Sequence, residues 1–221
     1  MEDGNRRAIN GEDLDRAARA ISAQFGVNTI YVVGSQALLV YREDIPRSLR
    51  FSVEIDAYPD PRQINKARHP YEASEEIAAL FGEGSNFHSA HGYYIDGVDE
   101  HTARLPDDWK DRAISKVIQS NEDGAITVIA PDPNDLVASK IIRGFEKDIE
   151  YAAICIGADI ASNQKIKQSL EKSLDGEELE RAKSRVDRAS HHKNNAIALS
   201  DTEISDELMA AYLKLKGRRG L

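Results

Sequence analysis

Two acidic side chains, Glu54 and Asp56, stand two positions apart in a run that largely alternates apolar and polar residues from Phe51 to Tyr58. The alternation predicts a β-strand that ends at Pro59. Because side chains two positions apart leave the same face of a strand, both carboxylates should point to one place. Carboxylates arranged in this way suit one or two Mg²⁺ ions, which neutralise phosphate charge in nucleotidyl transfer. We therefore expect Glu54 and Asp56 to be catalytic metal ligands.

A Gly-Ser pair, Gly34-Ser35, follows the β-branched and aromatic run Thr29–Val33 and precedes a predicted helix. A glycine lets the backbone turn tightly and approach a phosphate, and the amide groups that begin a helix can bind an anion. The Ser35 hydroxyl can donate a further hydrogen bond. Each motif alone also fits a structural turn or a solvated strand face, and their order strengthens the functional interpretation. We expect Gly34 and Ser35 to bind the β- and γ-phosphates of a nucleotide.

The order of the two motifs resembles the signature of the polymerase-beta nucleotidyltransferase superfamily, in which a strand ending in Gly-Ser is followed by a helix and an acid-x-acid strand. The resemblance implies a mixed sheet flanked by helices, NTP as the substrate and Mg²⁺ as the cofactor. The commoner acidic pair in that superfamily is Asp-x-Asp. Glu54 departs from this pattern, which puts the geometry of metal binding in question.

A second resemblance lies downstream, in residues 133–140, Arg143 and residues 146–148. These residues resemble the bacterial AbiEii-like branch of the superfamily, several members of which are toxins of toxin–antitoxin pairs. The resemblance implies that Lys140 contacts the nucleotide phosphates and that Asp148 completes the active site. It extends from the first of the predicted strands to the helix that carries Asp148.

The same helical region can be interpreted from its charges alone. Lys140, Arg143 and Lys147 recur at helical steps and would form a cationic stripe that faces a triphosphate. We expect Lys140 and Arg143 to bind nucleotide. A mixture of lysine, arginine and aspartate is also typical of a solvated helix face, and this alternative stays open for Asp148 as well.

Four other residues have both a chemical and a structural interpretation. Asp96 could supply a third carboxylate, but an aspartate followed by glycine is more typical of a turn. His88 and His91 have no cysteine or further histidine at ligand spacing, which favours packing over metal binding. Trp109 is expected to pack in a core rather than to stack on a base.

Charge and composition exclude several functional classes. The net charge is −9, so the field of the whole protein should repel nucleic acid, and an RNA contact would need a local patch or a metal. The most basic stretch, residues 181–193, is mixed with acids, which favours a solvated helix over an RNA or partner contact.

The single cysteine, Cys155, lies in an apolar run and is expected in the core. Without a long apolar stretch or a basic N-terminus, the chain is expected to be cytoplasmic and without a membrane partner.

The pattern of elements predicts an α+β fold, in which a nucleotidyltransferase-type mixed β-sheet flanked by helices is followed by a helical C-terminal lobe. We place the boundary near Pro131, giving a nucleotidyltransferase core over residues 1–131 and a lobe over residues 132–221. Strands are expected at residues 29–33, 51–58, 91–95, 113–119 and 125–129, with a hairpin turn at 121–124. Helices are expected at residues 12–25, 36–41, 62–81 with a break at Pro70, 135–144, 146–157, 163–173, 177–190 and 204–216.

Together these features predict a Mg²⁺-dependent nucleotidyltransferase that moves a nucleoside monophosphate from an NTP to a hydroxyl acceptor. The acceptor could be RNA such as tRNA, a protein or a small molecule, and the setting could be a toxin–antitoxin system with an antitoxin protein as partner. The alternative is a non-catalytic NTP-binding or toxin–antitoxin interaction protein that keeps the fold without turnover. Glu54 in place of aspartate and the large helical lobe favour this alternative.

Overall fold

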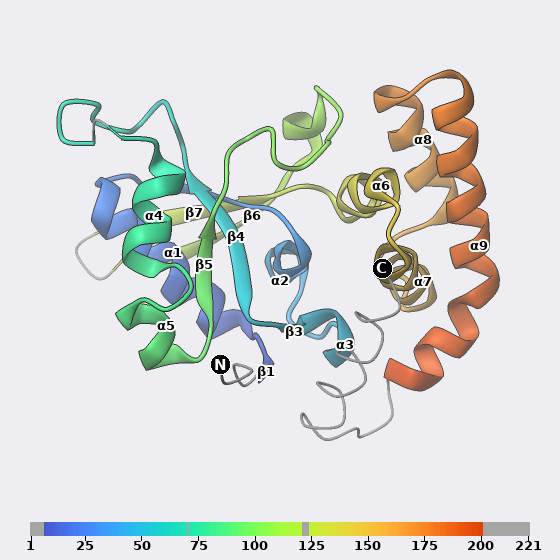
Figure 1. Ribbon diagram of the computed structural model, residues 1–221, viewed down its shortest axis with the longest axis horizontal. Coiled ribbons are helices and arrows are strands. Elements are labelled where there is room, and N and C mark those ends of the chain that lie inside the picture. The colour runs from blue at the N-terminus through green and yellow to red at the C-terminus, as the bar shows by residue number, and fades with distance from the viewer. Residues whose placement is uncertain (1–6, 70, 121–123, 201–221) are drawn as a thin grey trace. The chain divides into compact units, whose positions relative to one another are not determined.

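The computed structural model describes residues 7–69, 71–120 and 124–200 of the 221-residue chain (Figure 1). The chain divides into two compact units. Unit 1 takes its described residues from 7–44, 52–103 and 110–132, and unit 2 takes them from 45–51, 104–109 and 133–200. The expected division of the chain near Pro131 stays a prediction, and two short earlier segments join the helices of unit 2.

A five-stranded mixed sheet with strand order β5-β4-β2-β7-β6 forms the centre of unit 1. Its strands are β2 (Thr29–Val32), β4 (Glu54–Pro59), β5 (Tyr94–Gly97), β6 (Ile114–Gln119) and β7 (Ala125–Ala130). β2 runs antiparallel to β4 and parallel to β7, β4 runs parallel to β5, and β6 runs antiparallel to β7. The predicted mixed sheet and the predicted hairpin between β6 and β7 are confirmed, while residues 121–123 of its turn lie outside the described residues.

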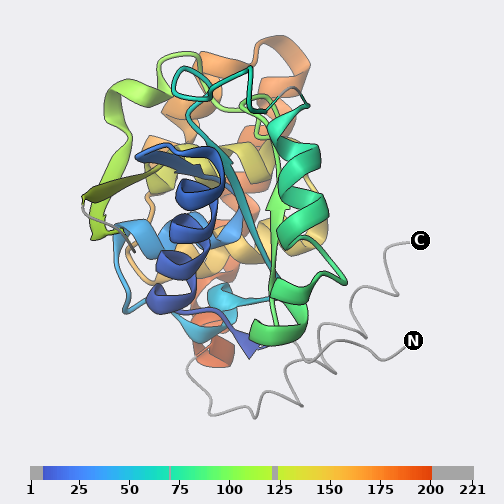
Figure 2. The same ribbon diagram turned by 90° about the vertical axis from the view of Figure 1, so that its left-hand side faces the viewer.

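Helices cover both faces of this sheet. Those of unit 1 are α1 (Gly11–Phe25), α2 (Leu38–Tyr41), α4 (Ala73–Phe81) and α5 (Asn86–His91), with the 3₁₀ turn η1 (Ser35–Ala37) before α2. Two very short strands, β1 (Arg7–Ala8) and β3 (Phe51–Ser52), and the 3₁₀ turn η2 (Trp109–Arg112) complete the elements outside the helices of unit 2. Figures 1 and 2 show α1 and α4 on one face of the sheet and α2 on the other.

Reciprocal caps begin α1. Asn10 Oδ1 accepts a hydrogen bond from the amide of Asp13 at 3.0 Å, and Asp13 Oδ2 accepts one from the amide of Asn10 at 3.1 Å. The helix ends at Gly26, whose φ of +65° is the left-handed conformation that glycine adopts most easily. Its apolar face is buried, as the three- and four-residue spacing predicts, through Leu14, Ala17, Ala18, Ile21 and Phe25.

Two predictions for the region between β4 and β5 are wrong. Residues 62–69 form turns rather than a helix, because Asp60 Oδ1 accepts the amide of Arg62 at 3.0 Å and Asn65 Oδ1 accepts the amide of Ala67 at 3.1 Å. Such side-chain bonds to the local backbone compete with helix formation. The strand expected from His91 begins only at Tyr94, because Ser85 caps the unpredicted helix α5.

The described part of unit 2 contains four long helices and one short helix. They are α3 (Arg47–Arg50), α6 (Pro133–Arg143), α7 (Glu146–Gly157), α8 (Asn163–Ser173) and α9 (Gly176–Ser200). Cys155 and Trp109 are buried, as expected. The bounds predicted for α7 and α8 are confirmed to the residue, whereas the helix predicted over residues 204–216 lies outside the described residues.

Candidate functional site

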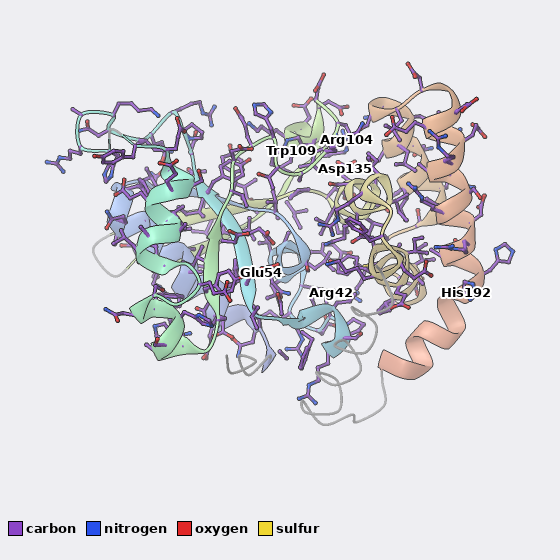
Figure 3. All side chains as sticks on the ribbon, viewed as in Figure 1. Arg42, Glu54, Arg104, Trp109, Asp135 and His192 are labelled. Atoms are coloured by element: carbon purple, nitrogen blue, oxygen red, sulfur yellow. The ribbon has the colours of Figure 1, made fainter. Side chains whose placement is uncertain are left out.

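Three carboxylates lie on one face of β4 and β5. In the parallel pairing of these strands, Asp56 is beside Asp96 and Glu54 is beside Tyr94. The intervening Ile55 and Ile95 are fully buried, whereas the three acids are half-buried. Glu54, Asp56 and Asp96 therefore form what we call the carboxylate face. Figure 3 labels Glu54 of this face.

The carboxylate face lies opposite to α1 and α4. A side chain added at Gly97 would meet Ser74 and Ile77 of α4, so the odd-numbered positions of β5 face that helix. Asp96 and its neighbours in register must then point to the side of the sheet where α2 lies. The prediction that Glu54 and Asp56 share a face is confirmed. The turn expected at Asp96 is wrong, since this residue lies within β5.

The turn after β2 brings the backbone of Gly34 against Asp56. The amide of Val33 donates to the carbonyl oxygen of Asp56 at 2.9 Å. A Cβ atom at Gly34 would overlap Asp56 Oδ2 and lie 2.6 Å from its Cγ. The backbone of Gly34, with φ +66° and ψ −163°, is also in a region that only glycine readily occupies. The expected convergence of the Gly-Ser turn and the acidic strand is therefore present for Asp56.

The helix that follows the Gly-Ser turn is shorter than an anion-binding helix. Ser35 opens the 3₁₀ turn η1, which continues into a single four-residue helix, α2. Because the dipole of so short a segment is small, an electrostatic contribution from a helix end is weak here. Phosphate binding at this turn would have to rely on local amide groups and the Ser35 hydroxyl.

Tyr94 is a member of this site that sequence reasoning missed. Its hydroxyl donates a hydrogen bond of 2.7 Å to Glu54 Oε2, and no other hydrogen bond to this carboxylate occurs among the described residues. The pattern Tyr93-Tyr94-Ile95-Asp96 repeats the alternation around Glu54 and Asp56. That alternation could have indicated that Tyr94 and Asp96 share one face of their own strand, while their place beside the acidic pair depends on the register of β5 with β4.

Burial and like charge raise the pKa values of Asp96 and Tyr94. The pKa of Asp96 is raised above its ordinary value of 3.8, first by burial and then by the negative charge of Glu54. The pKa of Tyr94 is raised by burial, by its hydrogen bond to Glu54 and by that residue's charge. Tyr94 therefore stays a neutral hydrogen-bond donor at neutral pH.

The donors of the carboxylate face suit a hard cation. Mg²⁺ prefers oxygen ligands and is commonly held by one or two carboxylates together with substrate phosphates. In the part of the chain that the structure describes, no three His, Cys, Asp or Glu side chains form a group that could already hold a metal ion. Two carboxylates completed by a nucleotide fit this arrangement.

His88 and His91 have packing partners in unit 1. His88 Nδ1 accepts the amide of Gly84 at 3.0 Å, and its ring lies edge-on to Tyr94 at 5.3 Å. The ring of His91 packs against Phe87 at 4.6 Å. These contacts agree with the expectation that both histidines have structural roles.

In unit 2, Lys140 is largely buried. Only 9% of the surface of this residue is exposed, and its Nζ lies 4.6 Å from the centre of the Tyr151 ring. This distance is within the range of a cation–π interaction. Burial raises the pKa of Tyr151 well above its ordinary value, so the ring beneath the ammonium group is neutral.

Arg143 and Asp148 bind each other through two hydrogen bonds. Arg143 Nε and Nη2 donate to Asp148 Oδ2 and Oδ1 at 2.9 Å and 2.6 Å. Asp148 Oδ2 also accepts the amide of Phe145 at 3.3 Å, at the start of α7. The Asp148 side chain is 3% exposed and the Arg143 side chain 49%. The structure thus brings together two of the predicted residues, with the aspartate buried and the guanidinium half in solvent.

Three cations of the basic stretch on α9, Lys183, Arg185 and Arg188, are bonded to groups within unit 2. Lys183 contacts Glu171 at 2.8 Å, and Arg188 contacts Glu146 at 2.7 Å. Arg185 donates to the carbonyl oxygen of Ile141 at 3.1 Å. These bonds agree with the solvated interpretation of this stretch, and an RNA or partner contact there stays untested.

Comparison with known protein families gives a match. A family model described as "Nucleotidyltransferase of unknown function (DUF6036)" matches residues 12–188. The chain belongs to this family. The match extends over all five strands of the sheet and from α1 into α9, so it includes the Gly-Ser turn and the carboxylate face. Searches of curated proteins and of solved structures found no match.

Among the residues that the structure describes, no helix has the length and the apolar character needed to cross a membrane. The cytoplasmic location stays a prediction.

Proposed function

We propose that this member of the family transfers a nucleoside monophosphate from an NTP to a hydroxyl acceptor and that the reaction depends on Mg²⁺. The observation that carries the proposal is the position of Asp56, whose carboxylate lies against the backbone of Gly34 while Glu54 and Asp96 share its face. A phosphate-binding turn next to a group of carboxylates is the arrangement that this reaction requires.

The residues of unit 1 have separate roles in the proposal. Gly34 permits close approach of the β- and γ-phosphates to the backbone, and Ser35 donates its hydroxyl to them. Glu54 and Asp56 hold one or two Mg²⁺ ions, which supply neutralisation of triphosphate charge. Asp96, with its raised pKa, is suited to accept the proton of the acceptor hydroxyl.

For unit 2, we propose that Lys140 and Arg143 are nucleotide ligands and that Asp148 is a further catalytic carboxylate. The half-exposed guanidinium of Arg143 supports the first role, because a fork of donors matches phosphate geometry. The two bonds from Arg143 to Asp148 support a role for the aspartate in orienting this guanidinium.

Label transfer tests the proposal. The full chain is incubated with Mg²⁺, each of the four NTPs labelled on the α-phosphate, and cell RNA and protein as acceptors. We expect labelled product with the wild type and none with Asp56→Asn, which keeps the shape of the side chain and removes its charge. Glu75→Gln, a loss of one charge on exposed Glu75 of α4, is the matched control and should transfer normally. Undiminished transfer by Asp56→Asn would refute the proposal.

A second candidate is an NTP-binding protein without turnover. It is favoured by Glu54, which stands where an aspartate is commoner in the superfamily that the chain resembles. Calorimetry separates the two candidates. NTP binding without Mg²⁺-dependent consumption supports the second candidate, and NTP consumption that requires Asp56 supports the first.

We also propose a toxin role, with tRNA, another RNA or a protein as the acceptor and an antitoxin protein as the partner. The resemblance of residues 133–148 to the AbiEii-like branch supports it. Growth arrest on induction of the wild type, absent on induction of Asp56→Asn, is the expected result. Growth that is unaffected by the induced wild type would argue against a toxin.

A further inference from the structure

Tyr94 is fixed beside Glu54 by the pairing of β5 with β4. The two residues are partners in the parallel register, and the Tyr94 hydroxyl donates to Glu54 Oε2 at 2.7 Å. A hydrogen bond to a charged carboxylate in a half-buried position is stronger than one between neutral groups. The bond therefore restrains one oxygen of Glu54 and leaves the other without a hydrogen-bond donor among the described residues.

This restraint matters because residue 54 is a glutamate. A glutamate has one more rotatable bond than an aspartate, so its carboxylate is less well positioned by the strand backbone alone. Ordering such a side chain costs conformational entropy each time a ligand binds. A hydrogen bond that already selects one conformation removes part of that cost before the cation arrives.

Tyr94 is itself held in place from several sides. Its amide donates to the carbonyl oxygen of Val53 at 2.8 Å. The ring of His88 lies edge-on to the Tyr94 ring at 5.3 Å, and His88 is in turn fixed by the amide of Gly84. The hydroxyl of Tyr94 is therefore presented to Glu54 from a supported ring, as a positioning group must be.

We propose that Tyr94 is a positioning residue that orients the Glu54 carboxylate for a divalent cation and so compensates for the longer side chain at this position. The inference rests on the proposed function of the carboxylate face. It assigns Tyr94 no contact with substrate, and its effect passes through Glu54 alone.

Cation binding measured without turnover tests this assignment. Mn²⁺ is titrated into the full chain, and the loss of the free-ion electron paramagnetic resonance signal reports binding. Tyr94→Phe keeps the ring and removes the hydroxyl, and we expect it to weaken Mn²⁺ affinity about tenfold, as loss of a group that orients a metal ligand commonly does. Tyr93→Phe is the matched control, because the Tyr93 hydroxyl donates to the Asp13 carbonyl oxygen at 2.8 Å and lies away from Glu54. Tyr93→Phe should lower thermal stability and leave Mn²⁺ affinity unchanged.

The same substitution in a Glu54→Asp background shows whether the effect passes through Glu54. An aspartate is too short to use the hydroxyl in the same way, so Tyr94→Phe should then have no further effect on Mn²⁺ affinity. Equal weakening in both backgrounds, or no weakening in the wild-type background, would overturn the inference. If the wild type binds Mn²⁺ and transfers label, and Tyr94→Phe binds Mn²⁺ equally well, this inference is wrong and the proposed function is unaffected. A wild type that does neither removes the proposed function and the inference together.

Discussion

Glycine is required at position 34 for two independent reasons. The backbone conformation there is one that only glycine readily adopts, and the space that a Cβ atom would fill is occupied by the Asp56 carboxylate. The residue that defines the turn and the residue expected to bind a cation therefore determine each other's position. A substitution at Gly34 or at Asp56 should therefore displace the other residue.

We predict that Gly34→Ala lowers the free energy of unfolding by about 2–3 kcal/mol, the scale of strong backbone strain, and abolishes label transfer. Gly26→Ala is the control, because Gly26 has a similar φ of +65° but nothing within 4 Å of an added Cβ atom. It should cost only about 1–2 kcal/mol and preserve transfer. Urea denaturation of both variants measures the difference.

Removal of the clash gives a further check on Gly34. In the double variant Gly34→Ala/Asp56→Ala, the nearest remaining side-chain atom of residue 56 would be its Cβ at 3.2 Å. Part of the lost stability should return, without any activity. A Gly34→Ala variant no less stable than Gly26→Ala would show that the contact with Asp56 is not limiting.

The raised pKa of Asp96 predicts a specific dependence of stability on pH. Because the folded state binds the Asp96 proton more tightly than the unfolded state, this residue stabilises the fold at low pH. The contribution is lost as the pH rises from the ordinary value of 3.8 through the raised folded value. Asparagine does not titrate, so Asp96→Asn avoids this loss. As the pH rises from 3.8 through the raised folded pKa, the unfolding free energy of the variant should therefore increase relative to that of the wild type.

Asp60→Asn is a control of opposite sign. The pKa of Asp60 is lowered, mainly by its hydrogen bond to Arg62, so its contribution is present above the ordinary pKa and lost as the pH falls through the lowered folded value. Asp60→Asn should therefore have a lower free energy of unfolding than the wild type at neutral pH. The difference between the two should shrink in acid. Urea unfolding at a series of pH values checks both, and parallel curves for wild type and Asp96→Asn would contradict the prediction.

Among the elements, the junction of α6 and α7 has an asymmetric ion pair. Asp148 is buried, whereas half of the Arg143 side chain is in solvent. Loss of the arginine leaves a buried carboxylate without its counter-ion, while loss of the aspartate's charge leaves a guanidinium that water can solvate. The two residues of one pair should thus contribute unequally.

We predict that Arg143→Met costs about 2 kcal/mol of unfolding free energy and Asp148→Asn about 1 kcal/mol. Asparagine also keeps an oxygen for the Phe145 amide, which Asp148 now accepts. Denaturant unfolding of both variants shows which of them has the lower free energy of unfolding. An Asp148→Asn variant less stable than Arg143→Met would contradict the asymmetry and place the main stabilisation in the cap of α7.

The elements also show which parts of the fold the sequence could predict. The bounds of α7 and α8 follow from apolar spacing and end signals that no distant contact overrides. Residues 62–69 differ from their predicted helix because aspartate and asparagine side chains bind the local backbone there, and such bonds leave little trace in an apolar pattern.

The candidate site was predictable to a similar and limited degree. The alternation around Glu54 and Asp56 places both acids on one face without knowledge of the partner strands. Asp96 and Tyr94 belong to that face only through the register of β5 with β4, which sequence spacing within one strand does not contain. The bond between Arg143 and Asp148 likewise depends on the turn between two helices.

At the scale of the whole chain, charge argues against long-range attraction of RNA. The net charge is −9, and Lys183 and Arg188 of the basic stretch on α9 are bonded to acids. An RNA acceptor would therefore have to be bound by short-range contacts or through the cation of the proposed site. Nucleotide, with its accompanying Mg²⁺, is the ligand whose binding should affect the stability of the chain most.

That expectation gives a prediction for thermal unfolding. A ligand that binds only the folded state adds about 2.7 kcal/mol of stability at one hundred times its dissociation constant, which corresponds to a rise in melting temperature of roughly 5–10 °C for a chain of this size. Tyrosine circular dichroism reports mainly on unit 1, because Tyr31, Tyr58, Tyr93 and Tyr94 are on its strands or beside them, whereas Tyr151 is the described tyrosine of unit 2. We expect Mg²⁺ with a non-hydrolysable NTP to raise this transition in the wild type and in Glu75→Gln, but not in Asp56→Asn. Either ligand component alone should raise it less, because the carboxylate face and the triphosphate each supply only part of the cation's oxygen ligands. An equal rise in Asp56→Asn would mean that the nucleotide binds elsewhere, and the carboxylate face would then lose its proposed role.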